Sequence, residues 1–184
     1  MNQQKVYADN FYTAFRRQNE FLSFLKERED HAEWNKREAK SLKVVALEDI
    51  ASVPSGNLEH MKGILSDTQQ NTQLLLQVQD EIYPLRSCAI RTLLERAKIS
   101  GNALNRLDKR TFSKILNYCL HVARGDALLR IADGKISAVH GGDSSDYSTL
   151  DMAALFQRTA GYLKNKFPSS EFVGGSFEHS MVTA

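Results

Sequence analysis

Two short apolar runs on either side of a tight-turn signal form the clearest local pattern in the chain. Ala127–Ile131 and Ile136–His140 flank the pair Asp133-Gly134. A type I′ turn needs a positive φ angle at both central positions, and Asp-Gly is one of the pairs that adopt it. The pattern therefore predicts a β-hairpin, followed by the polar loop GGDSSD. Because an isolated hairpin is marginal in water, helices or further strands must cover one of its faces.

The N-terminal part of the chain has the spacing of a helix. From residue 7 to about residue 41, apolar side chains recur at three- and four-residue steps without an intervening Pro or Gly, which predicts one long helix. Its second half, KEREDHAEWNKREAK, is almost entirely charged. One interpretation is a solvated face with i,i+4 charge pairs. The other is a helical arm that docks on a partner through the aromatic side chains of Phe11, Phe15, Phe21, Phe24 and Trp34.

The middle of the chain alternates between short apolar and polar stretches. Val44–Pro54 reads as a strand or a short helix that ends in a turn. Asn57 suits the N-cap of a short helix, NLEHMKGIL, because its side-chain oxygen accepts hydrogen bonds from free backbone amides. Thr72–Val78 predicts a strand, with a helix from Gln69 through Gln79 as the alternative.

Amphipathic helices are predicted on both sides of the hairpin. Ser87 caps the segment SCAIRTLLERAKI and Asp108 caps DKRTFSKILNYCLHVAR, and we expect these two helices to cover the hairpin. After the loop, Ser148 or Thr149 caps TLDMAALFQRTAGYLKNKF, which ends before Pro168. The last stretch, EFVGGSFEHSMVTA, alternates apolar and polar residues and predicts one or two closing strands.

These elements predict an α+β fold. Residues 1–43 form an N-terminal long helix or helical arm, and residues 44–184 form an α+β domain. In that domain a small antiparallel sheet, built on the central hairpin, is covered by helices.

Composition adds bounds to this picture. The chain has 184 residues, 42% of them hydrophobic, which suffices for a core, and its net charge of +2 by itself predicts no polyanionic partner. No segment has the roughly 18 to 20 uncharged apolar residues of a membrane span. The N-terminus lacks the layout of a signal peptide, so we expect a cytoplasmic protein. Cys88 and Cys119 lie in apolar helical patterns without a CxxC spacing, which favours reduced core thiols.

The charge is segregated along the chain, and this segregation provides the main candidate site. Residues 44–82 carry one Lys against six Asp or Glu, whereas residues 86–116 carry eight Lys or Arg against two acidic residues. Such a stretch can neutralise nucleic-acid phosphates, meet an acidic protein surface, or simply keep the protein in solution. Arg130 is a further candidate, because a charged side chain in an apolar strand must face solvent, a carboxylate or a partner. The candidate nucleic-acid or partner-binding residues are Arg91, Arg96, Lys98, Arg106, Lys109, Arg110, Lys114 and Arg130.

Motifs for catalysis are absent from the sequence. It contains no GxSxG, GxGxxG or GxxxxGK[ST] segment and no histidine pair at metal-ligand spacing. Asp143, Asp146 and Asp151 with His140 form the densest acidic group, which can hold Mg²⁺ in nucleases but is also typical of loops and helix starts. We therefore predict no catalytic residue, no metal and no cofactor, and keep a metal-dependent nuclease as a distant alternative.

The stretch from Tyr83 to Phe156 resembles a broad family of phage- and plasmid-borne proteins of undefined function. In that family an arginine-containing strand, an acidic-Gly turn and a second strand lead into a loop with an Asp-Tyr pair. The matching residues are Leu116, Asn117, Leu128, Leu129, Arg130, Asp133, Gly134, Ala138, Asp146, Tyr147 and Asp151.

What the resemblance implies is a mobile-element protein that acts in the cytoplasm of a bacterial host. The leading interpretation is a non-enzymatic binding protein that targets a host nuclease or nucleoprotein complex. Its most specific form is an anti-CRISPR inhibitor of a Cas nuclease. The alternative is direct binding of DNA or RNA in recombination or replication. The sequence leaves the oligomeric state open.

Overall fold

Mixed α and β elements follow one another along the chain in the computed structural model, which describes residues 5–52, 61–100, 103–141 and 149–184. The helices are α1 (Gln18–Asp30), α2 (Lys62–Gln70), α3 (Ser87–Arg96), α4 (Lys109–Val122) and α5 (Met152–Lys166), with short 3₁₀ turns η1 (Ala39–Ser41), η2 (Leu47–Ser52) and η4 (Leu104–Arg106). The strands are β1 (Tyr12–Phe15), β2 (Ala32–Glu38), β3 (Leu42–Ala46), β4 (Leu74–Val78), β5 (Glu81–Pro84), β6 (Asp126–Ala132), β7 (Lys135–Gly141), β8 (Gly175–Glu178) and β9 (Met181–Thr183).

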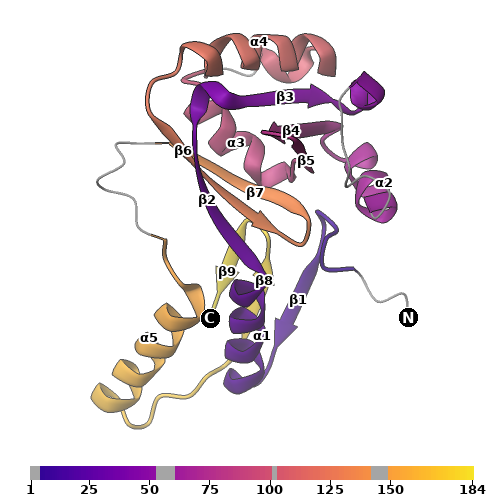
Figure 1. The fold of residues 1–184 in the computed structure, drawn as a ribbon. Coiled ribbons are helices and arrows are strands. Elements are labelled where there is room, and N and C mark those ends of the chain that lie inside the picture. Colours follow the sequence, from indigo (N-terminus) through magenta and orange to yellow (C-terminus); the bar gives the residue numbers. More distant parts are fainter. Residues whose placement is uncertain (1–4, 53–60, 101–102, 142–148) are drawn as a thin grey trace.

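The strands pair into three small antiparallel sheets. Their orders are β1-β8-β9, β2-β6-β7 and β3-β4-β5 (Figure 1). The α+β class is therefore confirmed, but the predicted arrangement is only partly so. The described residues form three sheets, and the hairpin supplies the central strand β6 and the edge strand β7 of one of them. None of the helices among the described ranges is long and apolar enough to cross a bilayer.

The predicted hairpin forms β6 and β7. The φ angles of Asp133 and Gly134 are 54° and 72°, as a type I′ turn requires. Arg130 pairs with Ala138 and Ile131 with Ile136, so one extra residue makes a bulge in β7. A core of apolar side chains from β3, β4, β6, β7, α3 and α4 packs against one face of the hairpin. As expected, α3 covers the hairpin, whereas α4 packs on β3 and η1 and joins the same core from there.

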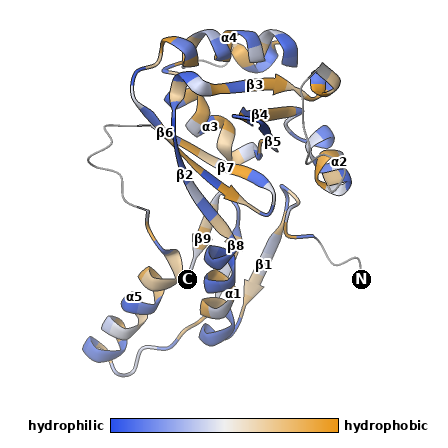
Figure 2. Ribbon diagram, in the orientation of Figure 1, coloured by the Kyte–Doolittle hydropathy of each residue, from blue (hydrophilic) through white to orange (hydrophobic). Residues whose placement is uncertain are grey.

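The prediction of one long N-terminal helix is wrong. The segment instead forms β1, α1 and β2, and β2 pairs along its whole length with β6, so that Trp34 lies opposite Arg130. The strand β2 is mostly hydrophilic in Figure 2. Its charged residues have little strand propensity of their own, and the pairing with the distant β6 edge decides its conformation. The expected boundary between residues 43 and 44 falls inside β3.

The remaining predictions for single elements are largely confirmed, with shifted ends. The segment predicted as a strand or a short helix forms both, since the strand β3 is followed by the 3₁₀ turn η2. The segment predicted as a strand from Thr72 to Val78 forms β4, and the alternative of a helix there is wrong. Asp108 caps α4 by accepting a hydrogen bond from the Thr111 amide at 2.9 Å. Asp151 caps α5 instead of Thr149, and Arg86 rather than Ser87 is the N-cap of α3. The predicted cap Asn57 lies outside the described residues, as does Ser148.

A side-chain amide covers the outer edge of β3. Asn117 of α4 donates to the Val44 carbonyl at 2.8 Å and accepts from the Val44 amide at 2.7 Å. It therefore replaces a neighbouring strand at this buried position, and its role is structural.

Substitution Asn117→Ala leaves two backbone groups of β3 without partners. Since an orphaned buried polar group costs about 1–3 kcal/mol, we expect the free energy of unfolding to fall by about that amount in urea denaturation. The exposed Asn105 provides the control, because Asn105→Ala removes no such pair. Equal stability of the two variants would contradict this role for Asn117.

Candidate functional site: a groove and the buried charges beside it

The two candidate binding residues within α3, Arg91 and Arg96, differ in exposure. Arg91 is exposed and lies 3.8 Å from Glu95. Arg96 is only 5% exposed and donates to the carbonyls of Arg124 and Gly125 at 2.7 and 2.9 Å. The expectation that Arg96 lies on the polar side of the helix is therefore wrong, because the carbonyls at the start of β6 draw it inward. A Cβ atom at Gly141 would lie 1.8 Å from the Arg96 Cδ, so this approach requires the glycine.

The basic residues around η4 and α4 differ in their surroundings. Lys98, Arg106 and Lys114 are exposed, and none lies within ion-pair distance of a carboxylate in the described part of the chain. The Lys109 ammonium lies 5.8 Å from the centre of the Phe112 ring. Arg110 pairs with Glu48 at 3.2 Å and Asp49 at 2.7 Å, so its charge is already compensated.

Arg130, the charged residue of the hairpin, faces a carboxylate and an aromatic ring. Its guanidinium donates to Glu29 at 3.0 Å and lies 5.8 Å from the Trp34 ring. The His140 ring stacks against Trp34 with centroids 6.3 Å apart. Burial is the main reason that the pKa of His140 is lowered. Arg130, Trp34 and His140 thus form an aromatic and cationic row on the face of the sheet opposite the core.

This row lies in a groove of about 610 Å³. Its floor is the outer face of β2, β6 and β7, and its sides come from α1, α3, the β8–β9 hairpin and the residues that lead into α5. Large apolar side chains line much of it, and two of them, Leu150 and Met181, are exposed at its rim. A second cavity of about 360 Å³ lies beside the groove, since Ser87, Cys88 and His179 line both.

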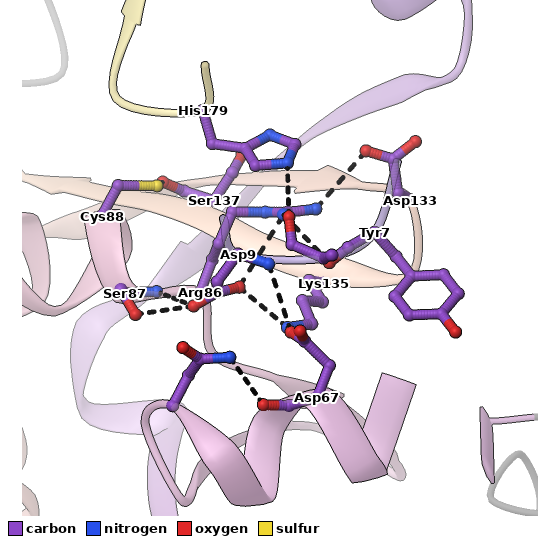
Figure 3. A network of polar contacts seen from close by, with 12 residues as sticks. Tyr7, Asp9, Asp67, Arg86, Ser87, Cys88, Asp133, Lys135, Ser137 and His179 are labelled. Carbon is purple, nitrogen blue, oxygen red and sulfur yellow. Dashed lines mark hydrogen bonds and ion pairs between the residues drawn. The ribbon is translucent and has the colours of Figure 1, made fainter. Parts of the chain in front are cut away.

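A buried network of charges lies next to the second cavity (Figure 3). The Lys135 ammonium is fully buried and donates to Asp9 at 2.8 Å and to Asp67 at 2.5 Å. Arg86, 1% exposed, lies 3.4 Å from Asp133 and 3.8 Å from Asp9. Arg28 of α1 forms a two-pronged pair with Asp133. Three cations thus face three carboxylates, which makes the burial of these charges tolerable.

Burial and the charges of the network together shift the pKa values of groups in and around it. Burial raises the pKa of Asp9, but the hydrogen bonds from Lys135 and Ser87 together lower it by more. The net pKa of Asp9 is therefore below its usual value. Burial, followed by the repulsion of Arg86 and Arg28, lowers the pKa of His179 to about 4. Burial also raises the pKa of the Cys88 thiol, which donates to the Ser137 carbonyl at 3.3 Å.

Of the three aspartates that could hold a metal ion in the predicted acidic group, the structure describes Asp151. Asp143 and Asp146 lie outside the described residues, and Asp151 accepts a hydrogen bond from the Ala154 amide at the start of α5. In the ranges that the structure describes, no three His, Cys, Asp or Glu side chains gather as metal ligands would.

Sequence reasoning missed the buried network, although one signal was available. Lys135 begins an apolar strand directly after the Asp-Gly turn, and the argument that singled out Arg130 applies equally to it. Asp9 and Asp67 carry no such signal, because each is a single acid in a polar stretch.

Comparison with known proteins gives no match for this chain among protein-family models, curated proteins or solved structures. The resemblance to phage- and plasmid-borne proteins therefore stays a prediction.

The lowered pKa of His179 predicts a pH dependence of stability. The folded protein keeps this ring neutral down to about pH 4, whereas the unfolded chain takes up a proton near its ordinary pKa of about 6.5. The stabilisation is present above pH 6.5 and is lost as the pH falls from 6.5 towards 4.

Urea denaturation at pH 7 and pH 5 should accordingly show a smaller loss of stability for His179→Gln than for the wild type. The exposed His121 serves as control, and His121→Gln should retain the wild-type dependence. An unchanged pH dependence in His179→Gln would contradict the burial of a neutral ring.

Proposed function

We propose that this chain is a non-enzymatic binding protein whose groove holds a segment of a protein partner in a nucleic-acid-processing complex. The observation that carries this proposal is the groove over the β2-β6-β7 sheet, where Trp34 lies against both Arg130 and His140 at the floor. Trp and Arg in a sheltered, apolar pocket are typical of the residues that dominate protein–protein binding energy.

The charges of the groove support a protein partner over a nucleic acid. Each arginine that lines it is compensated by a carboxylate: Arg130 by Glu29, Arg91 by Glu95 and Arg28 by Asp133. Binding of a polyanion gains most of its affinity from cations that replace the counterions of the phosphates. Apolar side chains at the rim, Leu150 and Met181, instead suit an apolar protein segment.

The state of the nearby reactive groups supports a non-enzymatic role. A nucleophilic cysteine needs a lowered pKa, and a general base works best with a pKa near the working pH. The pKa of the Cys88 thiol is raised, and that of His179 is about 4. Neither group is tuned for such chemistry.

The most specific version of the proposal is inhibition of a Cas nuclease in the cytoplasm of a bacterial host. It rests on the resemblance of the hairpin region to phage- and plasmid-borne proteins. An inhibitor of this kind acts by occupying a surface of the nuclease, which fits a chain whose groove binds and performs no reaction.

Direct binding of DNA or RNA is the second candidate function. It is favoured by the exposed cations Lys98, Arg106 and Lys114, which have no acidic partner among the described residues. Binding through them would weaken steeply with salt, because each phosphate contact releases counterions.

Variants at the groove rim test the leading proposal. Leu150→Glu and Met181→Glu place a charge where the partner's apolar segment would lie, and both residues are more than half exposed, so the fold should tolerate the change. Val122→Glu makes the same change on α4, away from the groove. In pull-downs from a bacterial host lysate, we expect the wild type and Val122→Glu to capture a protein that survives nuclease treatment, and both rim variants to lose it.

Other outcomes would redirect or end the proposal. Capture that disappears with nuclease, or gel shifts of DNA or RNA at low salt, would establish direct nucleic-acid binding in its place. Equal capture by all variants would exclude the groove. For the Cas version, a panel of purified guide-loaded nucleases should contain one that forms a complex and stops cutting, and failure with the whole panel would remove that version.

A further inference from the structure

An apolar stripe on α5 is covered at the start of the helix and open at its end. The stripe follows one side of the helix at alternating steps of three and four residues, and its members are Ala153, Phe156, Ala160, Leu163 and the C-cap residue Phe167. Ala153 is 9% exposed, and the Phe156 ring packs on the Phe21 ring of α1 with centroids 5.2 Å apart. Leu163 and Phe167, by contrast, are 42% and 59% exposed.

The arrangement of α1 and α5 accounts for this difference. Ala153 and Phe156 belong to an apolar cluster with Phe21 and Leu25 of α1. α1 begins at Gln18, about one turn before Phe21, and Figure 1 shows α5 running away from α1 towards its own C-terminal end. The open half of the stripe therefore continues an interface that already exists within the molecule, at the point where α1 no longer covers it.

The spacing of the stripe is typical of a helix that packs on another helix. Steps of three and four residues are the a and d positions of a coiled coil, and the residues at the e and g positions flank this seam and pair with charges of the partner helix. With Leu163 at a d position, the flanking residues of the open half are Lys164 and Lys166. In the covered half they are the uncharged Gln157 and Thr159. Positive charge therefore flanks the open half of the stripe.

These two lysines have no acidic partner among the described residues. Both are exposed, and the Lys164 ammonium donates to the Ser170 carbonyl, a neutral group, at 3.4 Å. From residue 152 to residue 170 the chain contains no Asp or Glu. An apolar surface with uncompensated cations on both sides is complementary to an apolar helix face with carboxylates on both sides.

Two other occupants fit this surface less well. A second copy of α5 would bring lysines against lysines, because the helix carries no acid of its own. A helix that lies on a lipid surface presents a broad apolar face, whereas the open part of this stripe is a single a/d seam wide. Leu155 and Tyr162 are exposed as well, but Thr159 and Lys166 separate them from the stripe around the helix.

We infer that the C-terminal half of α5 binds an amphipathic helix of a protein partner, in which Asp or Glu residues flank the apolar stripe. The apolar side chains of the partner helix cover Leu163 and Phe167, and its carboxylates pair with Lys164 and Lys166. This helix extends the contact that α1 makes with the first half of α5. The site is separate from the groove, because none of these four residues lines it.

Two helical peptides test this site on the full chain. Both carry Leu at the a and d positions, and one has Glu and the other Lys at the e and g positions. Like charges at these positions disfavour pairing of each peptide with itself. In fluorescence anisotropy titrations the Glu peptide should bind the wild type. The Lys peptide should bind about tenfold more weakly or worse, because two ion pairs become two repulsions.

Variants of α5 show whether the stripe and its flanking charges carry the binding. In the double variant Lys164→Glu, Lys166→Glu the preference should invert, so that the Lys peptide binds more tightly than the Glu peptide. Leu163→Glu should lose binding of the Glu peptide. Tyr162→Glu is the matched control, because Tyr162 is 61% exposed and lies off the stripe, and this variant should bind the Glu peptide as the wild type does.

Several outcomes would overturn the inference. They are failure of the Glu peptide to bind the wild type, equal binding by Leu163→Glu, and a preference that charge reversal leaves unaltered. A wild-type dimer in light scattering that Leu163→Glu dissociates would assign the surface to a second copy instead. Binding to vesicles of equal parts phosphatidylcholine and phosphatidylglycerol that the same variant loses would assign it to a membrane.

The groove variants keep the two binding surfaces distinguishable. Leu150→Glu and Met181→Glu change the rim of the groove and leave the open half of the α5 stripe intact. Both should bind the Glu peptide as the wild type does. Loss of peptide binding in Leu163→Glu together with its retention in the rim variants supports a separate site on α5, and equal loss in all three contradicts it.

Discussion

The structure depends on a fully buried ammonium group, that of Lys135. Its two carboxylate partners, Asp9 and Asp67, come from 126 and 68 residues away in the sequence. Breaking a buried ion pair is strongly destabilising, so the loss of either carboxylate should weaken the fold. With Arg86 and Arg28, the network joins residues that adjoin all three sheets. Electrostatic pairing thereby fixes long-range positions that apolar packing leaves undetermined, since hydrophobic attraction is not directional.

The same network shapes the candidate binding surface. Arg28 holds α1 against the hairpin turn through Asp133, and the next residue, Glu29, meets Arg130 at the floor of the groove. Trp34 lies on this face only because β2 pairs with β6. The groove therefore combines the outer face of the core hairpin and one side of α3 with segments that precede and follow the main core in the sequence. Its compensated charges and apolar rim are the features on which we propose a protein partner.

Local signals in the sequence sufficed for the elements that local interactions decide. The Asp-Gly turn, the cap at Asp108 and the apolar faces of α3 and α4 were all predictable, because each depends on neighbouring residues. The strand β2 was not, because its conformation depends on a partner about a hundred residues away. Of the candidate site, Arg130 is predictable as a charged side chain in an apolar strand. Arg96 is predicted on the polar side of its helix but lies buried, and nothing in the sequence points to Asp9. The charge of Lys135 in an apolar strand is visible in the sequence, but its pairing with distant acidic residues is not.

A double-mutant cycle on Lys135 and Asp67 tests the central claim most directly. The variants Lys135→Met, Asp67→Ala and their combination are compared by urea denaturation. The more exposed pair Lys36 and Asp126, whose charged atoms lie 3.0 Å apart, is treated in the same way. We expect a coupling energy of about 2 kcal/mol or more for the buried pair and less than about 1 kcal/mol for the exposed pair. Effects of Lys135→Met and Asp67→Ala that add to within about 0.5 kcal/mol would contradict a fold that depends on this network.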